Sequence, residues 1–267
     1  MAWPVSMTPA ETYAALLQRA KDDPVVLAFW LGGSRGMGRP TRYSDYDCTF
    51  IVDEVAYPAF CAEFGLSEPF QADWRPGIDL AVQTFPMLKA AADWGSDQQG
   101  YRYGYAHLTA TIDKTGRAQR LIEDKARVPT EAVPAFIHAS LDRAINQAYR
   151  ALKCLRDRDP AASRLEAAEA IAPFLDAAFA LHERRLRPYY KYLRWELETF
   201  PLERLPFGAG EMMERLAELL SDRPAPALSR LLADSLAAFR AAGHAAAFDG
   251  WGAKLAWILA GDPFGTP

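Results

Sequence analysis

Cysteine and histidine are scarce in this sequence, and none of them falls in a metal-binding spacing. The 267 residues include four histidines and three cysteines, Cys48, Cys61 and Cys154. No CxxC pair and no HExxH motif occurs. An odd cysteine count without such a pair argues against a disulfide framework and against a cysteine-ligated zinc site. A reducing compartment is the default for such a chain, so we expect a cytoplasmic protein.

Long apolar runs and a strong basic charge are also missing. No uninterrupted apolar stretch reaches about 18 residues, the length at which a membrane span is considered, so we expect no membrane partner. The N-terminus has no basic start followed by an apolar stretch, so we expect no secretory signal. The net charge is −4. A mildly acidic chain without a basic tail does not favour a nucleic-acid partner.

Two widespread phosphate-binding motifs are absent too. No GxxxxGK[ST] segment is present, and no GxGxxG follows a strand and opens a helix. The chain therefore has neither a P-loop nor a dinucleotide-binding fingerprint. What it has instead is a glycine- and arginine-rich stretch after an apolar run, WLGGSRGMGRPTRYSDYDCTFIV, at residues 30–52.

The first half of the chain mixes strand and helix signals. Half of all residues are hydrophobic, which is ample for a core. Thr8, Pro9 and Glu11 have a capping-box spacing and predict a helix over 8–21. A further short helix is predicted over 57–64. Apolar and β-branched segments predict strands over 25–31, 48–52, 78–85 and 108–112, with a turn at 113–116 from which 119–122 could pair back.

The second half is rich in Ala, Leu, Arg and Glu and predicts helices throughout. Apolar residues recur near a period of 3.6 over 130–152, 163–185, 188–201, 208–220, 227–242 and 244–259. We therefore predict an α+β fold class. A mixed-sheet domain would occupy residues 1–128, and an all-α helical-bundle domain would occupy residues 129–267.

Two aspartates at the start of the 48–52 strand point to a metal ion. Asp45 and Asp47 are separated by one residue, and alternation along a strand turns both side chains to one face. Two like charges that close are unfavourable unless a cation lies between them. Carboxylate oxygens suit Mg²⁺ or Mn²⁺ rather than zinc, and Mg²⁺ in proteins is often shared with substrate phosphates.

The turn before these aspartates has the residue types that bind the phosphate groups of a substrate. Its glycines let the backbone take positive φ values and approach a ligand closely. Backbone N–H groups near Gly33 and the Ser34 hydroxyl can then hold phosphate oxygens. Arg35 adjoins Ser34 and is the arginine that we expect to contact phosphate.

These residues resemble the nucleotidyltransferase superfamily that includes DNA polymerase β and the antibiotic (aminoglycoside) nucleotidyltransferases. The family pattern is a Gly-Ser pair, roughly ten residues, and then Asp-x-Asp. Here Gly33-Ser34 is followed by residues 35–44 and by Asp45-Tyr46-Asp47. The family carries a third carboxylate on a later strand, and Asp79 in GIDLAV fits that context. The resemblance covers residues 25–85, and the helical half agrees in architecture only.

The resemblance implies transfer of a nucleoside monophosphate from an NTP to a hydroxyl group. The expected co-substrate is ATP, and the expected acceptor is a small molecule, with aminoglycoside-like antibiotics as the first candidates. By resemblance, Asp45 and Asp47 hold Mg²⁺ or Mn²⁺. Asp79 either completes the metal site or takes the acceptor proton, and the sequence leaves both roles open. Asp73, Asp93 and Asp97 are rivals of Asp79 in loop-like or helix-like surroundings, and Asp113 is an alternative candidate for the base.

A basic and aromatic segment, residues 184–192, offers a contribution from the second domain. Lys191 could reach the β- and γ-phosphates, as a lysine does in related enzymes. It could equally be a helix-surface charge that pairs with Glu196. An acidic pocket for a polycationic acceptor could include Glu183, Glu196 and Glu198.

Two alternative functions remain open at this point. One is nucleotidyl transfer to a protein or to an RNA end, against which the absence of a basic tail argues. The other is a nucleotide-binding sensor without turnover. The presence of three candidate carboxylates favours the enzyme over the sensor.

Overall fold

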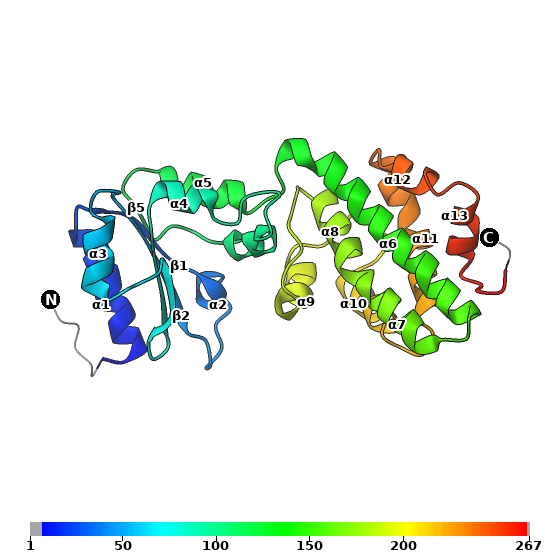
Figure 1. Cartoon of the computed structure of the whole chain (residues 1–267), viewed down its shortest axis with the longest axis horizontal. Coiled ribbons are helices and arrows are strands. Elements are labelled where there is room, and N and C mark those ends of the chain that lie inside the picture. Colours follow the sequence, from blue (N-terminus) through cyan, green and yellow to red (C-terminus); the bar gives the residue numbers. More distant parts are fainter. Residues whose placement is uncertain (1–6, 266–267) are drawn as a thin grey trace. The chain divides into compact units, whose positions relative to one another are not determined.

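The computed structural model divides the chain into two compact units, Met1–Arg127 (unit 1) and Val128–Pro267 (unit 2), and describes residues 7–265 (Figure 1). Residues 1–6 belong to the segment in which we expect no secretory signal, and they lie outside the described residues. Unit 1 contains a mixed sheet with flanking helices, and unit 2 is helical. The predicted α+β fold class is confirmed.

A five-stranded mixed sheet forms the centre of unit 1. The strand order is β3-β4-β2-β1-β5, in which β2 and β4 are parallel and the other neighbours are antiparallel. The strands are β1 (Val26–Leu31), β2 (Tyr46–Val52), β3 (Phe70–Arg75), β4 (Ile78–Gln83) and β5 (Ile112–Asp113). The helices are α1 (Pro9–Asp22), α2 (Gly33–Gly36), α3 (Tyr57–Phe64), α4 (Phe85–Ala90), the 3-10 helix η1 (Gln99–Tyr105) and α5 (Arg117–Lys125).

Helices α1 and α3 cover one face of this sheet (Figure 1). Helix α1 begins with the predicted capping box, in which the Thr8 hydroxyl accepts from the Glu11 N–H and the Glu11 carboxylate accepts from the Thr8 N–H. Its Leu16 packs into an apolar core with alternate strand residues such as Phe50 and Leu80. Because every second residue of β2 and β4 enters this core, the residues between them face the other side.

That other side carries α2, α4 and α5 (Figure 1). Helix α4 packs against β2, and α5 packs against α4 and β5. The turn Gly33–Gly36 lies beside β1 and β2. The residues of β2 and β4 that point to this side are therefore the ones that can meet the glycine-rich turn.

Two sequence predictions for unit 1 are wrong, and one strand was not predicted. Residues 119–122 belong to α5, because Ala118, Ile122 and Lys125 recur at helical spacing and are buried together. The strand predicted over 108–112 is reduced to β5, which begins only at Ile112. Strand β3 was not predicted because it is an edge strand whose first four residues are exposed, so it has no buried apolar run.

Unit 2 is organised around its long helix α6. The helices are the 3-10 helix η2 (Thr130–Ala132), α6 (Val133–Arg156), α7 (Pro160–Glu169), α8 (Ile171–Leu181), α9 (Tyr190–Thr199), α10 (Ala209–Glu218), α11 (Pro224–Ala241), α12 (Ala245–Asp249) and α13 (Lys254–Ala260). Ile137, Leu141 and Ile145 of α6 are fully buried, and α6 packs against α7, α8 and α11. Within residues 7–265, no helix combines the length and the apolarity that a bilayer crossing requires.

Two long helices predicted for unit 2 are each divided. The segment 163–185 forms α7 and α8, because Pro173 in the first turn of α8 has no N–H to continue the α7 ladder. Helix α8 ends at Leu181, before Glu183 and Arg184 take left-handed φ values of 55° and 61°. The segment 244–259 is interrupted around Gly252, whose φ is 53°.

Candidate active site

Asp47 of β2 and Asp79 of β4 lie directly opposite each other on neighbouring parallel strands. Their neighbours Cys48 and Leu80 are core residues, so the two aspartates point to the face that carries α2. Adjacent strands are about 4.8 Å apart, which brings two carboxylates together at the start of both strands. Sequence alternation predicts the face of each aspartate, but the pairing register comes from the fold alone.

Asp45 completes a cluster of three carboxylates. One oxygen from each of Asp45, Asp47 and Asp79 lies within 4.8 Å of the others. Asp45 is exposed, and the other two are half-buried. Three negative charges this close repel one another unless a cation is shared between them. An all-oxygen donor set of this kind fits Mg²⁺ or Mn²⁺.

The electrostatic effect of this cluster reaches the core side of β2. Burial, followed by the negative charges of Asp47 and Asp79, raises the pKa of the Cys48 thiol to about 12. Cys48 is therefore a neutral thiol at physiological pH. It packs as a core residue and is not a nucleophile of this site.

Gly33 places the glycine-rich turn directly against Asp47. A Cβ atom on Gly33 would lie 1.9 Å from Oδ2 of Asp47, and the φ of Gly33 is +54°. The preceding Gly32 N–H donates to the Asp47 carbonyl at 2.7 Å. No side chain can therefore stand between the turn and the carboxylate, and Gly33 is required by both space and backbone conformation.

Ser34 is tied to the loop that carries Asp45. Its hydroxyl donates to Oγ of Ser44 at 2.8 Å, and Oγ of Ser44 accepts from the Thr41 N–H at 2.9 Å. Ser34 thus links the turn to the segment before the aspartates. The sequence predicted a phosphate contact for Ser34 and did not anticipate this link.

Arg35 holds the backbone of the same loop. Its Nε donates to the carbonyls of Ser44 and Asp45 at 3.1 and 2.9 Å, and Nη2 donates to the Ser44 carbonyl at 2.8 Å. The guanidinium also lies 4.0 Å from the ring centroid of Tyr46. Arg35 therefore fixes the backbone on both sides of Asp45, a positioning role that the sequence did not reveal.

Asp79 is oriented by a backbone group that the sequence could not identify. Its Oδ1 accepts from the Asp73 N–H at 2.8 Å. Asp73, a rival candidate from the sequence, has a left-handed φ of 47° and an exposed side chain. In the cluster with Asp45 and Asp47, the structure places the side chain of Asp79 and not that of Asp73.

Lys191 lies on α9 in unit 2, where it is exposed. Its ammonium lies 4.8 Å from the ring centroid of Tyr192.

Two arginines of the predicted basic segment form ion pairs inside unit 2. Arg185 pairs with Glu196 at 2.8 Å, and Arg187 pairs with Asp176 at 2.9 Å.

Of the three glutamates predicted for an acidic pocket, Glu183 lines a cavity of unit 2 together with Arg185 and Arg204, whereas Glu196 and Glu198 do not line it. Glu196 is only 2% exposed and is bound by Arg185 inside unit 2. Glu198 lies 3.9 Å from Arg194 on the helix surface. Glu196 is therefore a buried structural partner and does not line a pocket for a cationic acceptor.

Comparisons with solved structures show a distant likeness in fold. No family model matches the chain, and no curated protein sequence matches it. The chain is similar to the crystal structure of a nucleotidyltransferase-like protein from Exiguobacterium sibiricum 255-15, with a TM-score of 0.44 and 9% sequence identity. The likeness covers 88% of this chain and 77% of that chain. The function of the site is therefore inferred from its own residues and geometry.

Proposed function

We propose that this protein is a metal-dependent nucleotidyltransferase that moves a nucleoside monophosphate from an NTP to a hydroxyl group. The observation that carries the proposal is the cluster of Asp45, Asp47 and Asp79, whose carboxylate oxygens lie within 4.8 Å of one another. The glycine-rich turn lies directly beside this cluster, at a position where residue 33 must be glycine. A carboxylate cluster suits a divalent cation, and an adjoining glycine turn suits the phosphates that such a cation accompanies.

The residues of the site have separate proposed roles in metal binding and in positioning the carboxylates. Asp45 and Asp47 would hold Mg²⁺ or Mn²⁺, which supplies charge neutralisation for the triphosphate when it is bound. Because Gly33 has no side chain, the turn can lie against Asp47 without a clash with its carboxylate. Arg35 holds the Asp45 backbone in place, so the carboxylates are positioned before a ligand arrives.

Asp79 has two roles that its geometry supports. The Asp73 N–H holds Oδ1 by one hydrogen bond, and the carboxylate keeps further lone pairs with which to meet a cation or take the acceptor proton. An Asp79→Asn variant separates these roles. If Asp79 is the base, the variant keeps metal and NTP affinity and loses transfer. If Asp79 is a ligand, metal affinity falls as well.

For the finer assignment, we propose ATP as the co-substrate and a small hydroxyl-bearing molecule as the acceptor. Aminoglycoside-like compounds are the first to test, by resemblance of the Gly33-Ser34 and Asp45-x-Asp47 pattern alone. We propose a phosphate contact for Lys191, whose exposed position on α9 leaves its ammonium accessible to solvent.

The direct test is release of pyrophosphate from each NTP with Mg²⁺ or Mn²⁺ and a panel of small-molecule, protein and RNA acceptors. We expect metal-dependent release with at least one acceptor, and loss of release in Asp45→Asn and Asp47→Asn. The matched control is Asp97→Asn, which removes an exposed carboxylate elsewhere in unit 1. NTP binding without release under any acceptor would contradict the transferase and favour a nucleotide sensor.

A further inference from the structure

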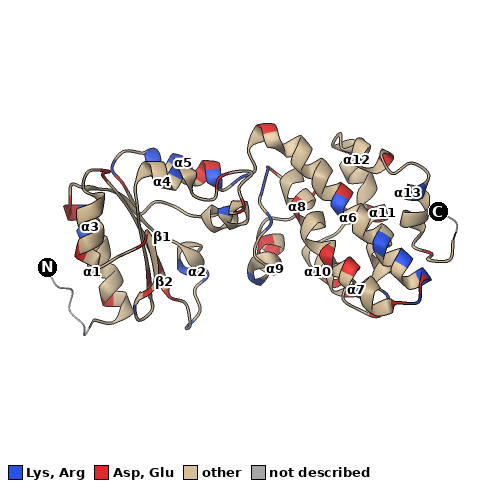
Figure 2. Ribbon diagram, viewed as in Figure 1, with Lys and Arg blue, Asp and Glu red and all other residues tan. Residues whose placement is uncertain are grey.

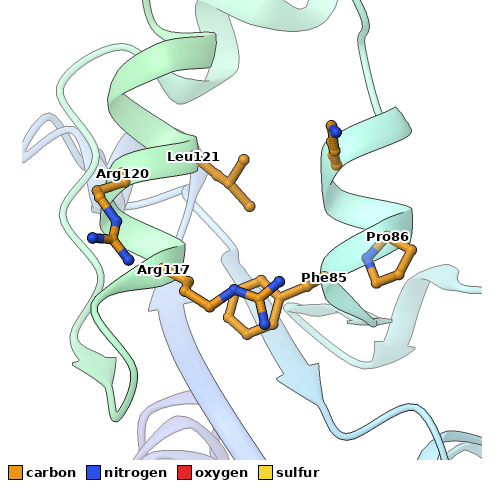
Figure 3. A pocket seen from close by; sticks show the side chains of 6 residues that line it. Phe85, Pro86, Arg117, Arg120 and Leu121 are labelled. Atoms are coloured by element: carbon orange, nitrogen blue, oxygen red, sulfur yellow. The ribbon is translucent and has the colours of Figure 1, made fainter.

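The space between α4 and α5 forms a cavity in unit 1, with a volume of about 410 Å³ (Figure 3). Its lining residues are Phe85, Pro86, Lys89, Arg117, Arg120 and Leu121. In Figure 3, Phe85 and Pro86 come from one helix, and Arg117, Arg120 and Leu121 come from the other. Small-molecule pockets span about 300–1,000 Å³, so this cavity is large enough for a small ligand.

The charge of this cavity is all of one sign. Three of its six lining residues are cationic and none is acidic. Among residues 7–265, no carboxylate forms an ion pair with Lys89, Arg117 or Arg120, whereas Arg185 and Arg187 of unit 2 are both paired. Figure 2 shows blue ribbon segments in the region of α4 and α5. Three exposed and unpaired cations around one cavity favour an anion with more than one negative charge.

The apolar part of the cavity is arranged by a cation–π contact. The guanidinium of Arg117 lies 4.1 Å from the ring centroid of Phe85, and Figure 3 shows it reaching across from α5 to α4. Leu121 and Pro86 are the other apolar residues that line the cavity. The Phe85 ring is only 4% exposed and lies under this guanidinium, so the guanidinium plane of Arg117 is the surface on which a flat group can stack. The lining therefore offers contacts to a flat apolar body next to the cationic groups.

A buried lysine fixes the spacing of the two helices. Lys125 of α5 is 3% exposed, and its Nζ donates to the carbonyls of Lys89 and Ala91 at 2.8 and 2.6 Å. These carbonyls belong to the C-terminal end of α4, where helical partners are missing. Arg117 contacts the start of α4 and Lys125 contacts its end, so the cavity is held open by contacts at both ends.

This cavity is separate from the carboxylate cluster. Asp79 lies at the beginning of β4, and α4 follows the other end of the same strand. At about 3.3 Å per residue, the two ends of that strand are roughly 15 Å apart. A ligand in the α4–α5 cavity would therefore not contact Asp79 through the residues that line it.

We propose that the α4–α5 cavity binds a small phosphate monoester carried on a flat apolar group. A phosphate monoester has a charge of about −1.5 to −2 at neutral pH, which matches several cations better than a carboxylate does. Arginine forks bind phosphate oxygens in pairs. The guanidinium plane of Arg117 and the surface of Pro86 and Leu121 supply the contacts for the flat group. The proposal does not depend on nucleotidyl transfer at the carboxylate cluster.

The test uses phenyl phosphate, inorganic phosphate and phenol as probes of the full-length protein, with EDTA present. NMR signals of the Arg117 and Arg120 Nε–H groups report binding at the cavity. We expect saturable shifts with phenyl phosphate, and about tenfold weaker binding of inorganic phosphate or phenol, because each lacks one half of the contacts. Repeating the titration in Asp45→Asn/Asp47→Asn should leave the affinity unchanged, which separates this cavity from the carboxylate cluster.

The matched variants are Arg120→Glu, at the cavity, and Lys21→Glu, which reverses an exposed cation on α1. Arg120→Glu should weaken phenyl phosphate binding by about tenfold or more, and Lys21→Glu should leave it within about twofold. An unperturbed amide spectrum verifies that each variant is folded. The proposal is overturned if no saturable shift occurs, if inorganic phosphate binds as well as phenyl phosphate, or if the two variants behave alike.

Discussion

Asp47 and Asp79 face each other across the parallel pair β2 and β4, in direct register. Side chains at such positions point the same way, so the fold itself brings their carboxylates together. Asp45 adds a third oxygen within 4.8 Å. Uncompensated like charges destabilise a fold, and the proposed cation would relieve this repulsion at the start of the two strands.

The first prediction concerns stability without metal. Asp45→Asn removes one negative charge from the cluster and should raise Tm by roughly 2 °C, or about 0.5 kcal/mol, a small value because Asp45 is exposed. Mg²⁺ should then raise Tm of the wild type more than that of the variant. Differential scanning calorimetry with EDTA and with Mg²⁺ measures both effects. A lower Tm for Asp45→Asn in EDTA would show that the cluster is not under repulsion.

The second prediction compares two glycines of the same turn. Gly33 and Gly38 both have positive φ, at +54° and +70°, but only a Cβ on Gly33 meets Asp47. Gly38→Ala should cost about 1 kcal/mol through backbone strain alone. Gly33→Ala should cost about 1–3 kcal/mol more and abolish metal binding, because the Asp47 carboxylate must move. Urea unfolding and Mn²⁺ titration measure the two effects, and equal behaviour of the two variants would contradict the close approach.

The third prediction concerns Arg35. Arg35→Ala removes three hydrogen bonds to the Ser44 and Asp45 carbonyls and should loosen residues 41–45. Faster amide exchange in this segment and about tenfold weaker Mn²⁺ binding are expected. Arg42→Ala, which changes an exposed arginine of the same loop, is the control. An unchanged exchange rate in Arg35→Ala would assign Arg35 to direct ligand contact instead of positioning.

Several residues of the candidate site could be predicted from the sequence because the patterns that indicate them are local. The alternation in SDYDCTFIV predicts that Asp45 and Asp47 share a face, and the apolar neighbours of Asp79 predict a strand. The contacts that orient these residues are not local. The register between Asp47 and Asp79 and the Asp73 N–H on Asp79 depend on how strands pair, which periodicity does not encode.

The errors in the fold also have local physical causes. A short amphipathic segment such as 119–122 fits a strand or a helix by its apolar residues alone, and burial of Ala118 and Lys125 decides for the helix. The α7–α8 division was readable from Pro173, since proline removes a ladder hydrogen bond. Edge strand β3 lacks the apolar pattern on which the strand predictions rested.

The fourth prediction is a pH dependence in unit 2. The Arg204 N–H donates to Nε2 of His182 at 3.0 Å, so Nδ1 carries the proton that is donated to the Ala178 carbonyl at 2.6 Å. Burial lowers the pKa of His182 below its ordinary value of 6.5, and the charges of Arg185 and Arg204 lower it further. The unfolded chain therefore binds this proton more readily than the folded protein does.

It follows that the contribution of His182 to stability is complete above pH 6.5 and declines as the pH falls through the lowered pKa of the folded state. The pKa of His182 is measured by NMR titration of its ring protons, and the free energy of unfolding by urea between pH 7.5 and 5. A titration midpoint of His182 at or above 6.5 would contradict the buried neutral ring.

The most direct test of the central claim is calorimetric titration of Mn²⁺ into the full-length protein with ATP present, compared with Asp47→Asn and with the control Asp97→Asn. We predict that the wild type and Asp97→Asn bind the metal with equal affinity. We predict that Asp47→Asn binds it at least about a hundredfold more weakly, because one carboxylate ligand is lost. Equal binding by all three proteins would show that the Asp45, Asp47 and Asp79 cluster is not a metal site.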